Sequence, residues 1–255
     1  MPRTPCCIAA TLALAGAAHA GFNGTDFEQY ALGDIDGQAG WTVFEEQRKT
    51  GLGAHIVDRD GSRQLALFND KDSPPGTLTG AFSPIFKNPD AGRLRVAITI
   101  DDDDGADYDV VGQSTDEGLL TFRVRFGFEG SILVLDNIGA GLRFIDTGVE
   151  WAQNERRTLE VRYDSAANSI EYRYDGALVY TGVAGLFAGT RVDQAVVLHD
   201  NMQNFGVGSF SGDPLAAAYV DSVFLIPAPG AALALGVGLL GTPRRGRRAP
   251  GPADV

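Results

Sequence analysis

Three short segments of the chain are dense in acidic and amide side chains, the groups that bind hard cations. They are residues 101–109 (DDDDGADYD), 69–76 (NDKDSPPG) and 58–61 (DRDG). Calcium takes about six to eight oxygen ligands, and its charge offsets the repulsion between neighbouring carboxylates. The EF-hand spacing is absent, so the favoured interpretation of the first segment is a solvated acidic loop without metal. A calcium site is the alternative, with Asp101, Asp102, Asp103, Asp104, Asp107 and Asp109 as candidate ligands.

The same segment contains a candidate sugar-binding ring. Sugars stack their apolar C–H faces on exposed aromatic rings, while nearby polar side chains bond the hydroxyls. Tyr108 lies between Asp107 and Asp109 with no apolar neighbour in the acidic segment, so we expect it to be exposed. The other aromatic residues alternate with polar ones along strands and are predicted to be core residues; they are Phe122, Phe126, Tyr163, Tyr172 and Tyr174. Trp41 and Trp151 are also interpreted as packing residues.

Side chains that could catalyse a reaction are not grouped in the sequence. Glu150 and Glu155 have odd spacing and would point to opposite faces of a strand, and Glu160 and Glu171 alternate with core positions and should face outward. His55 and His199 form neither a metal-binding nor a Ser-His-Asp pattern. The sequence therefore predicts that the protein is not an enzyme.

Strands must position these groups, because apolar residues recur with a period of two along most of the chain. The predicted strands are residues 41–46, 54–58, 64–68, 94–100, 122–126, 131–136, 142–146, 159–163, 170–174, 194–199 and 218–225. Residues 159–163 and 170–174 should form a hairpin across a polar turn. Such strands must bury their inner faces against a second sheet, which predicts an all-β sandwich.

The N-terminus resembles a secretion signal in composition. Arg3 precedes an apolar run over residues 6–16, and residues 18–20 (AHA) have the small-x-small pattern of a cleavage site. We therefore expect residues 1–20 to be removed. Cys6 and Cys7 are the only cysteines and lie inside this signal, so the mature chain should contain no thiol.

A second targeting feature lies near the C-terminus, within residues 226–248. It comprises the motif Ile226, Pro227, Ala228 and Pro229, an apolar run to residue 241, and the cluster Arg244, Arg245, Arg247 and Arg248. An apolar run of about 12–16 residues would span roughly 20–24 Å, a marginal membrane crossing. The arginines should stay cytoplasmic. The segment predicts a short transmembrane helix, followed by a disordered tail over residues 249–255.

Charge limits the partners of the body, residues 21–225, which we interpret as one domain. Of the 21 basic and 33 acidic residues of the whole chain, the body carries 16 and 32. This negative field repels the phosphates of nucleic acids and anionic lipids. We therefore expect no nucleic-acid partner, and membrane contact only through the C-terminal helix.

Three segments of the body resemble a known superfamily. Residues 26–41 (DFEQYALGDIDGQAGW) resemble the opening strand and loop of concanavalin A-like lectin/glucanase (LamG-like) domains. Residues 151–182 resemble its tryptophan-led strand, tyrosine-rich hairpin and YDG segment, and residues 217–225 (AAYVDSVFL) its closing strand beside the first. The resemblance implies a two-sheet antiparallel jelly-roll β-sandwich. The superfamily includes glucanases, whose Glu-x-Asp-x-x-Glu pattern is absent from this sequence.

Residues 226–248 resemble a PEP-CTERM sorting signal, although the motif reads Pro-Ala-Pro and seven residues follow the arginines. This resemblance implies an exosortase-type sorting enzyme as partner. It also implies transient anchoring in the inner membrane and delivery to the cell surface or extracellular matrix of a Gram-negative bacterium. A plain weak tail anchor is the alternative.

Two functional hypotheses follow. The first is a non-catalytic surface or matrix protein with a structural or adhesive role. The second is a lectin-like module that binds polysaccharide. A diverged glycoside hydrolase is a third and weaker hypothesis, because the pair of carboxylates that such an enzyme needs is not visible.

Overall fold

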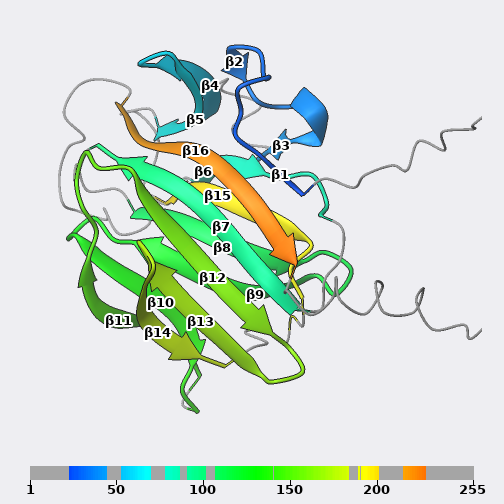
Figure 1. Ribbon diagram of the computed structural model, residues 1–255, viewed down its shortest axis with the longest axis vertical. Helices are drawn as coiled ribbons and strands as arrows, with labels where there is room; N and C mark the ends of the chain where they lie inside the picture. The colour runs from blue at the N-terminus through cyan, green and yellow to red at the C-terminus, as the bar shows by residue number, and fades with distance from the viewer. Residues whose placement is uncertain are drawn as a thin grey trace, which may run out of the picture.

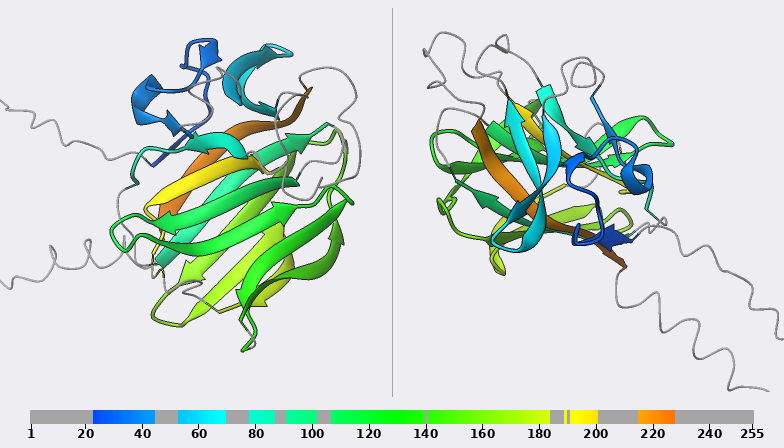
Figure 2. Two further views of the ribbon diagram at one scale, coloured as in Figure 1. Left: turned by 180° about the vertical axis from the view of Figure 1, so that it is seen from behind. Right: turned by 90° about the horizontal axis from the view of Figure 1, so that it is seen from above.

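The computed structural model describes residues 23–44, 53–69, 78–86, 91–101, 107–139, 141–183, 189, 191–200 and 215–227. Within these residues the chain forms two antiparallel sheets that pack face to face (Figures 1 and 2). The predicted all-β sandwich is therefore confirmed. A single short 3-10 helix, η1 (Gln38–Gly40), is the only helix in the described part of the chain.

The larger sheet has nine strands among the described residues. Their spatial order is β14 (Ala177–Gly182), β13 (Ser169–Tyr174), β12 (Arg157–Asp164), β7 (Ala91–Ile100), β16 (Leu215–Pro227), β5 (Ser62–Asn69), β4 (Ala54–Arg59) and β2 (Gly33–Asp34), and β1 (Gly24–Thr25) also pairs with β16. Gly24 lies opposite Phe224, and Thr25 opposite Val223. The closing strand thus returns beside the first strand, as the resemblance implied.

The smaller sheet has seven described strands. Their order is β11 (Leu142–Glu150), β10 (Ser131–Asn137), β9 (Leu119–Phe126), β8 (Asp107–Ser114), β15 (Gln194–Asp200), β6 (Leu78–Phe82) and β3 (Thr42–Val43). Figure 2 shows this sheet in front when the molecule is seen from behind.

The core fills the space between the two sheets with the inward residues of the alternating strands. Aromatic rings meet across it, because Phe122 lies 6.3 Å from Tyr172 and Phe126 lies 6.1 Å from Tyr174, centroid to centroid. Trp41 is fully buried, as predicted. A polar contact also joins the sheets, since Tyr180 Oη donates to Asp136 Oδ2 at 2.8 Å. Burial, together with this bond, raises the pKa of Tyr180 to about 12.

The predicted hairpin of residues 159–163 and 170–174 is confirmed as β12 and β13, with Tyr163 opposite Ile170. The predicted strand at residues 41–46 is observed only as β3, and residues 45 and 46 lie outside the described residues. Five described strands are not among the predicted ones, namely the two-residue strands β1 and β2 and the longer strands β6, β8 and β14. Strand β8 changes the interpretation of the acidic segment.

The described residues contain no helix that is both long enough and sufficiently apolar to cross a membrane. The predicted C-terminal helix and its arginines lie outside them, as do Ala228 and Pro229. Ile226 and Pro227 are described, and they form the end of β16, opposite Arg93 and Gly92 of β7. The proline motif therefore begins on the last strand of the sandwich.

Candidate functional site

The acidic segment that was expected to form a loop is partly a strand. β8 starts at Asp107, and its residues alternate between the two sides of the seven-stranded sheet. Tyr108 and Val110 join the core between the sheets. Asp107 and Asp109 therefore lie on the opposite, outer side of this sheet.

The expectation that Tyr108 is exposed is wrong, because only 1% of its surface is accessible. Its ring packs edge to face against His199 of β15, with 5.2 Å between the ring centroids. The two residues are cross-strand neighbours. A sugar can stack only on an exposed ring, so the buried ring of Tyr108 does not fit the predicted role.

Asp109 is bound by two arginines of the adjacent strand β9. Its Oδ1 accepts from Arg125 Nε at 2.9 Å, and its Oδ2 accepts from Arg123 Nε at 2.7 Å. Arg125 also pairs with Asp107 at 2.9 Å, and its guanidinium lies 4.5 Å from the ring centroid of Phe144. The register explains the cluster, because Arg125 lies directly opposite Asp109.

These ion pairs bear on the calcium prediction. Asp101 lies at the end of β7 and pairs with Arg59 at 2.8 Å, whereas Asp107 and Asp109 pair with arginines of β9. The three described candidate ligands thus do not form one loop site, and among the described residues no group of three or more metal-ligating side chains is found. Asp102, Asp103 and Asp104 lie outside the described residues.

The same geometry bears on catalysis. Asp107 and Asp109 share one face of one strand, which is the placement that two glycosidase carboxylates need. A general acid must hold a proton for the leaving oxygen. Asp109 instead accepts charged hydrogen bonds on both oxygens. In the sequence these two aspartates were interpreted as part of the acidic segment and not as a catalytic pair.

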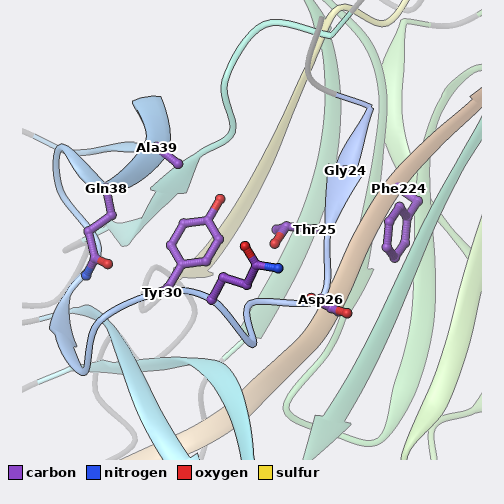
Figure 3. A pocket seen from close by; sticks show the side chains of 8 residues that line it. Gly24, Thr25, Asp26, Tyr30, Gln38, Ala39 and Phe224 are labelled. Carbon is purple, nitrogen blue, oxygen red and sulfur yellow. The ribbon is translucent and has the colours of Figure 1, made fainter. Parts of the chain in front are cut away.

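An opening lies at the N-terminal edge of the nine-stranded sheet. It encloses about 600 Å³ and is lined by Gly24, Thr25, Asp26, Gln29, Tyr30, Gln38, Ala39 and Phe224. In Figure 3, Tyr30 and Gln38 come from the N-terminal loop on one side of β1, and Phe224 comes from β16 on the other. We call this opening the β1 pocket.

Two features of the loop shape the β1 pocket. Gln38 closes the loop on itself, because its side chain donates to the carbonyls of Ala31 and Asp34 at 3.0 and 2.7 Å and accepts from Ala31 N at 2.8 Å. Tyr30 forms part of the wall, where its hydroxyl accepts from Trp41 Nε1 at 3.0 Å. These bonds leave Gln38 with no spare donor for a ligand.

Other polar groups of the β1 pocket remain available. Asp26 and Gln29 are exposed, and within the described residues Gln29 has no hydrogen-bond partner, while Asp26 accepts only from Glu28 N at 3.3 Å through Oδ1. Phe224 is 37% exposed and packs against Gly24, where a Cβ would overlap its ring. An open aromatic ring beside free acceptor and amide groups suits a polar ligand with apolar faces.

No protein-family model matches the sequence, and no curated protein matches it. Solved structures do match. A sialidase aligns with a TM-score of 0.60 at 14% identity, over 84% of this chain but only 19% of the sialidase. A non-specific endo-β-1,3(4)-glucanase of family GH16 aligns with a TM-score of 0.55 at 11% identity, over 79% and 88%. The β-glucanase of Bacillus licheniformis aligns at 0.53 and 15% identity, over 83% and 99%.

These similarities show the fold, because identities this low carry no information about activity. The two sheets, the pairing of the first and last strands and the glucanase neighbours indicate a two-sheet, jelly-roll-like β-sandwich. The predicted antiparallel jelly-roll fold is therefore confirmed.

Proposed function

We propose that the protein is a non-catalytic, carbohydrate-binding jelly-roll protein with an adhesive role at the cell surface or in the extracellular matrix. The observation that carries this proposal is the β1 pocket, which is lined by the exposed ring of Phe224 and by Asp26 and Gln29. Sugar sites typically combine a stacking ring with a few hydrogen-bonding groups. The jelly-roll fold is compatible with this function, since one structural neighbour is a glucanase.

The ion-paired carboxylates of β8 support the non-catalytic part of the proposal. A hydrolase of this fold would need one free nucleophilic carboxylate and one protonated partner. Arg125 lies within 2.9 Å of both Asp107 and Asp109, so both acids are engaged in ion pairs.

Replacing Phe224 with alanine should weaken glycan binding by about 1–2 kcal/mol, the range for losing an aromatic contact, with little change in melting temperature. A glycan array with the purified protein identifies the sugar, and calorimetry with that sugar measures the loss. Ile138→Ala is the matched control, because Ile138 is 50% exposed and lies after β10, in the connection to β11 of the other sheet. Binding that survives Phe224→Ala unchanged would place the sugar elsewhere, and an array without any bound glycan would favour a purely structural role.

We also propose that the protein is exported and then sorted to the cell surface. This part of the proposal rests on the signal-like residues 1–20 and on the resemblance of residues 226–248 to a PEP-CTERM signal. An exosortase-type enzyme would read the proline motif where it leaves β16 and release the body outside the cell.

Changing Pro227 and Pro229 to leucine should leave the precursor unprocessed in the membrane, because the sorting enzyme no longer finds its motif. Pro250→Leu, beyond the arginines, should have no effect. Intact-mass analysis of the surface protein measures the outcome. A mature wild-type form that still carries residues 244–248 would contradict sorting and would indicate a tail anchor.

A further inference from the structure

The outer face of the nine-stranded sheet carries arginines in two adjacent cross-strand rows. The register places Phe224, Arg95, Glu160 and Arg173 in the first row, and Ile226, Arg93, Arg162 and Glu171 in the second. We call Arg93, Arg95, Arg162 and Arg173, together with the groove beside them, the arginine face. Its first row begins at Phe224, which also lines the β1 pocket.

Two glutamates lie among the four arginines of these rows. Glu160 accepts from Arg162 Nε at 2.6 Å and lies 3.5 Å from Arg93, and its side chain is only 16% exposed. Glu171 is 40% exposed and pairs with Arg173 at 3.1 Å. With four arginines against two glutamates, this part of the sheet still carries a net positive formal charge.

Arg95 is the cation best placed for a ligand. It is exposed, and within the described residues it has no carboxylate partner within ion-pair distance. It borders a groove of about 330 Å³ that is also lined by Thr158, Glu160, Arg162, Arg173, Asp175 and Gly176.

The acid at the far end of the groove is engaged by an arginine. Asp175 pairs with Arg157, and this hydrogen bond holds the pKa of Asp175 below its ordinary value. Arg157 also pairs with Glu155, so Asp175 is ion-paired but shares its arginine with a second acid. Thr158 adds a hydroxyl to the wall.

We propose that the arginine face binds the carboxylates of an acidic, uronate-type polysaccharide whose chain continues into the β1 pocket. The inference rests on the proposed carbohydrate-binding function and adds the class of glycan. Guanidinium groups form charge-assisted, often bidentate bonds with carboxylates. Strands about 4.8 Å apart place Phe224 and Arg173 roughly 14 Å from each other, which suits an oligosaccharide better than a single sugar.

Charge complementarity gives a reason for this placement. The body carries 16 basic against 32 acidic residues, so a polyanion is repelled by most of its surface. Screening limits that repulsion to about 8–10 Å in physiological salt. Close to the arginine face, short-range pairing with Arg95 and its neighbours can therefore hold a carboxylated chain.

Polygalacturonate and its fully methyl-esterified form test the inference, because they differ in the charge of the carboxyl groups. The wild-type protein should bind polygalacturonate more tightly, and the preference should decrease with salt. Arg95→Gln should weaken binding of polygalacturonate about tenfold, the loss of roughly one charged hydrogen bond, and leave binding of the ester unchanged. Arg143→Gln is the control, since Arg143 is an exposed arginine of the other sheet.

Equal affinity of the wild-type protein for the two polymers would overturn the inference. The same follows if Arg143→Gln loses as much affinity for polygalacturonate as Arg95→Gln does. If a neutral glycan binds at Phe224 without any preference for acid, only the arginine face is refuted and the proposed function stands. If Arg95→Gln instead dissociates a dimer in sedimentation experiments and leaves polygalacturonate binding unchanged, the face binds the acidic surface of a second copy, and the inference is wrong.

Discussion

Replacing Arg125 with methionine is expected to lower the free energy of unfolding by about 3–5 kcal/mol, the usual loss when one partner of a buried ion pair is removed. The Arg125 side chain is 5% exposed and contacts Asp107 and Asp109, which are 1% and 0% exposed. Without the guanidinium, both buried carboxylates lose a main source of compensation. Urea denaturation measures the loss.

Two further variants show whether charge burial is the cause. Arg123→Met should cost less, because the Arg123 side chain, which also pairs with Asp109, is 23% exposed. Adding Asp109→Asn to Arg125→Met should restore part of the stability, since the uncompensated charge is removed. If the double variant is less stable than Arg125→Met alone, the loss comes from packing against Phe144.

The fold could be predicted because one side of most strands is buried and the other is not. Ile170, Tyr172 and Tyr174 of β13 are buried, and Glu171 and Arg173 between them are only partly covered. Because of this difference, apolar residues recur at every second position along the strand. The same alternation led correctly to the core positions of Phe122 and Phe126.

The unpredicted strands lack that signal for identifiable reasons. In β8 the outer positions hold Asp107 and Asp109, so the segment was interpreted by its charge instead of its alternation. Arginines of β9 compensate the charge of these aspartates. Which arginine lies opposite which aspartate depends on the register between β8 and β9, and the local sequence does not show that register. In β6, Gly80 interrupts the apolar pattern, and it is needed because a Cβ would overlap the backbone of β15.

The candidate site was hidden for another reason. Asp26 and Gln29 belong to the first segment of the body and Phe224 to the last strand, and only the pairing of β1 with β16 brings them together. The resemblance predicted that pairing but not the pocket beside it. The arginine face likewise depends on the registers of four strands.

Tyr108→Ala is expected to lower the free energy of unfolding by about 3–5 kcal/mol, as for other large aromatic side chains that are removed from a core. The sequence alone suggested the opposite, a small effect at an exposed ring. The buried position of Tyr108 between the sheets and its edge-to-face contact with His199 require the larger loss. Thermal and urea unfolding of the purified variant measure it.

Tyr108→Phe keeps the ring and should retain most of the stability, so it separates the packing of the ring from the hydroxyl. Ile138→Ala, at a 50% exposed residue, should cost less than about 0.5 kcal/mol, as is usual for surface positions. Because Tyr108 faces the core on the seven-stranded sheet, whereas the β1 pocket lies on the nine-stranded sheet, any remaining folded Tyr108→Ala protein should bind glycan normally. Unchanged stability together with lost glycan binding would mean that Tyr108 contacts the sugar after all.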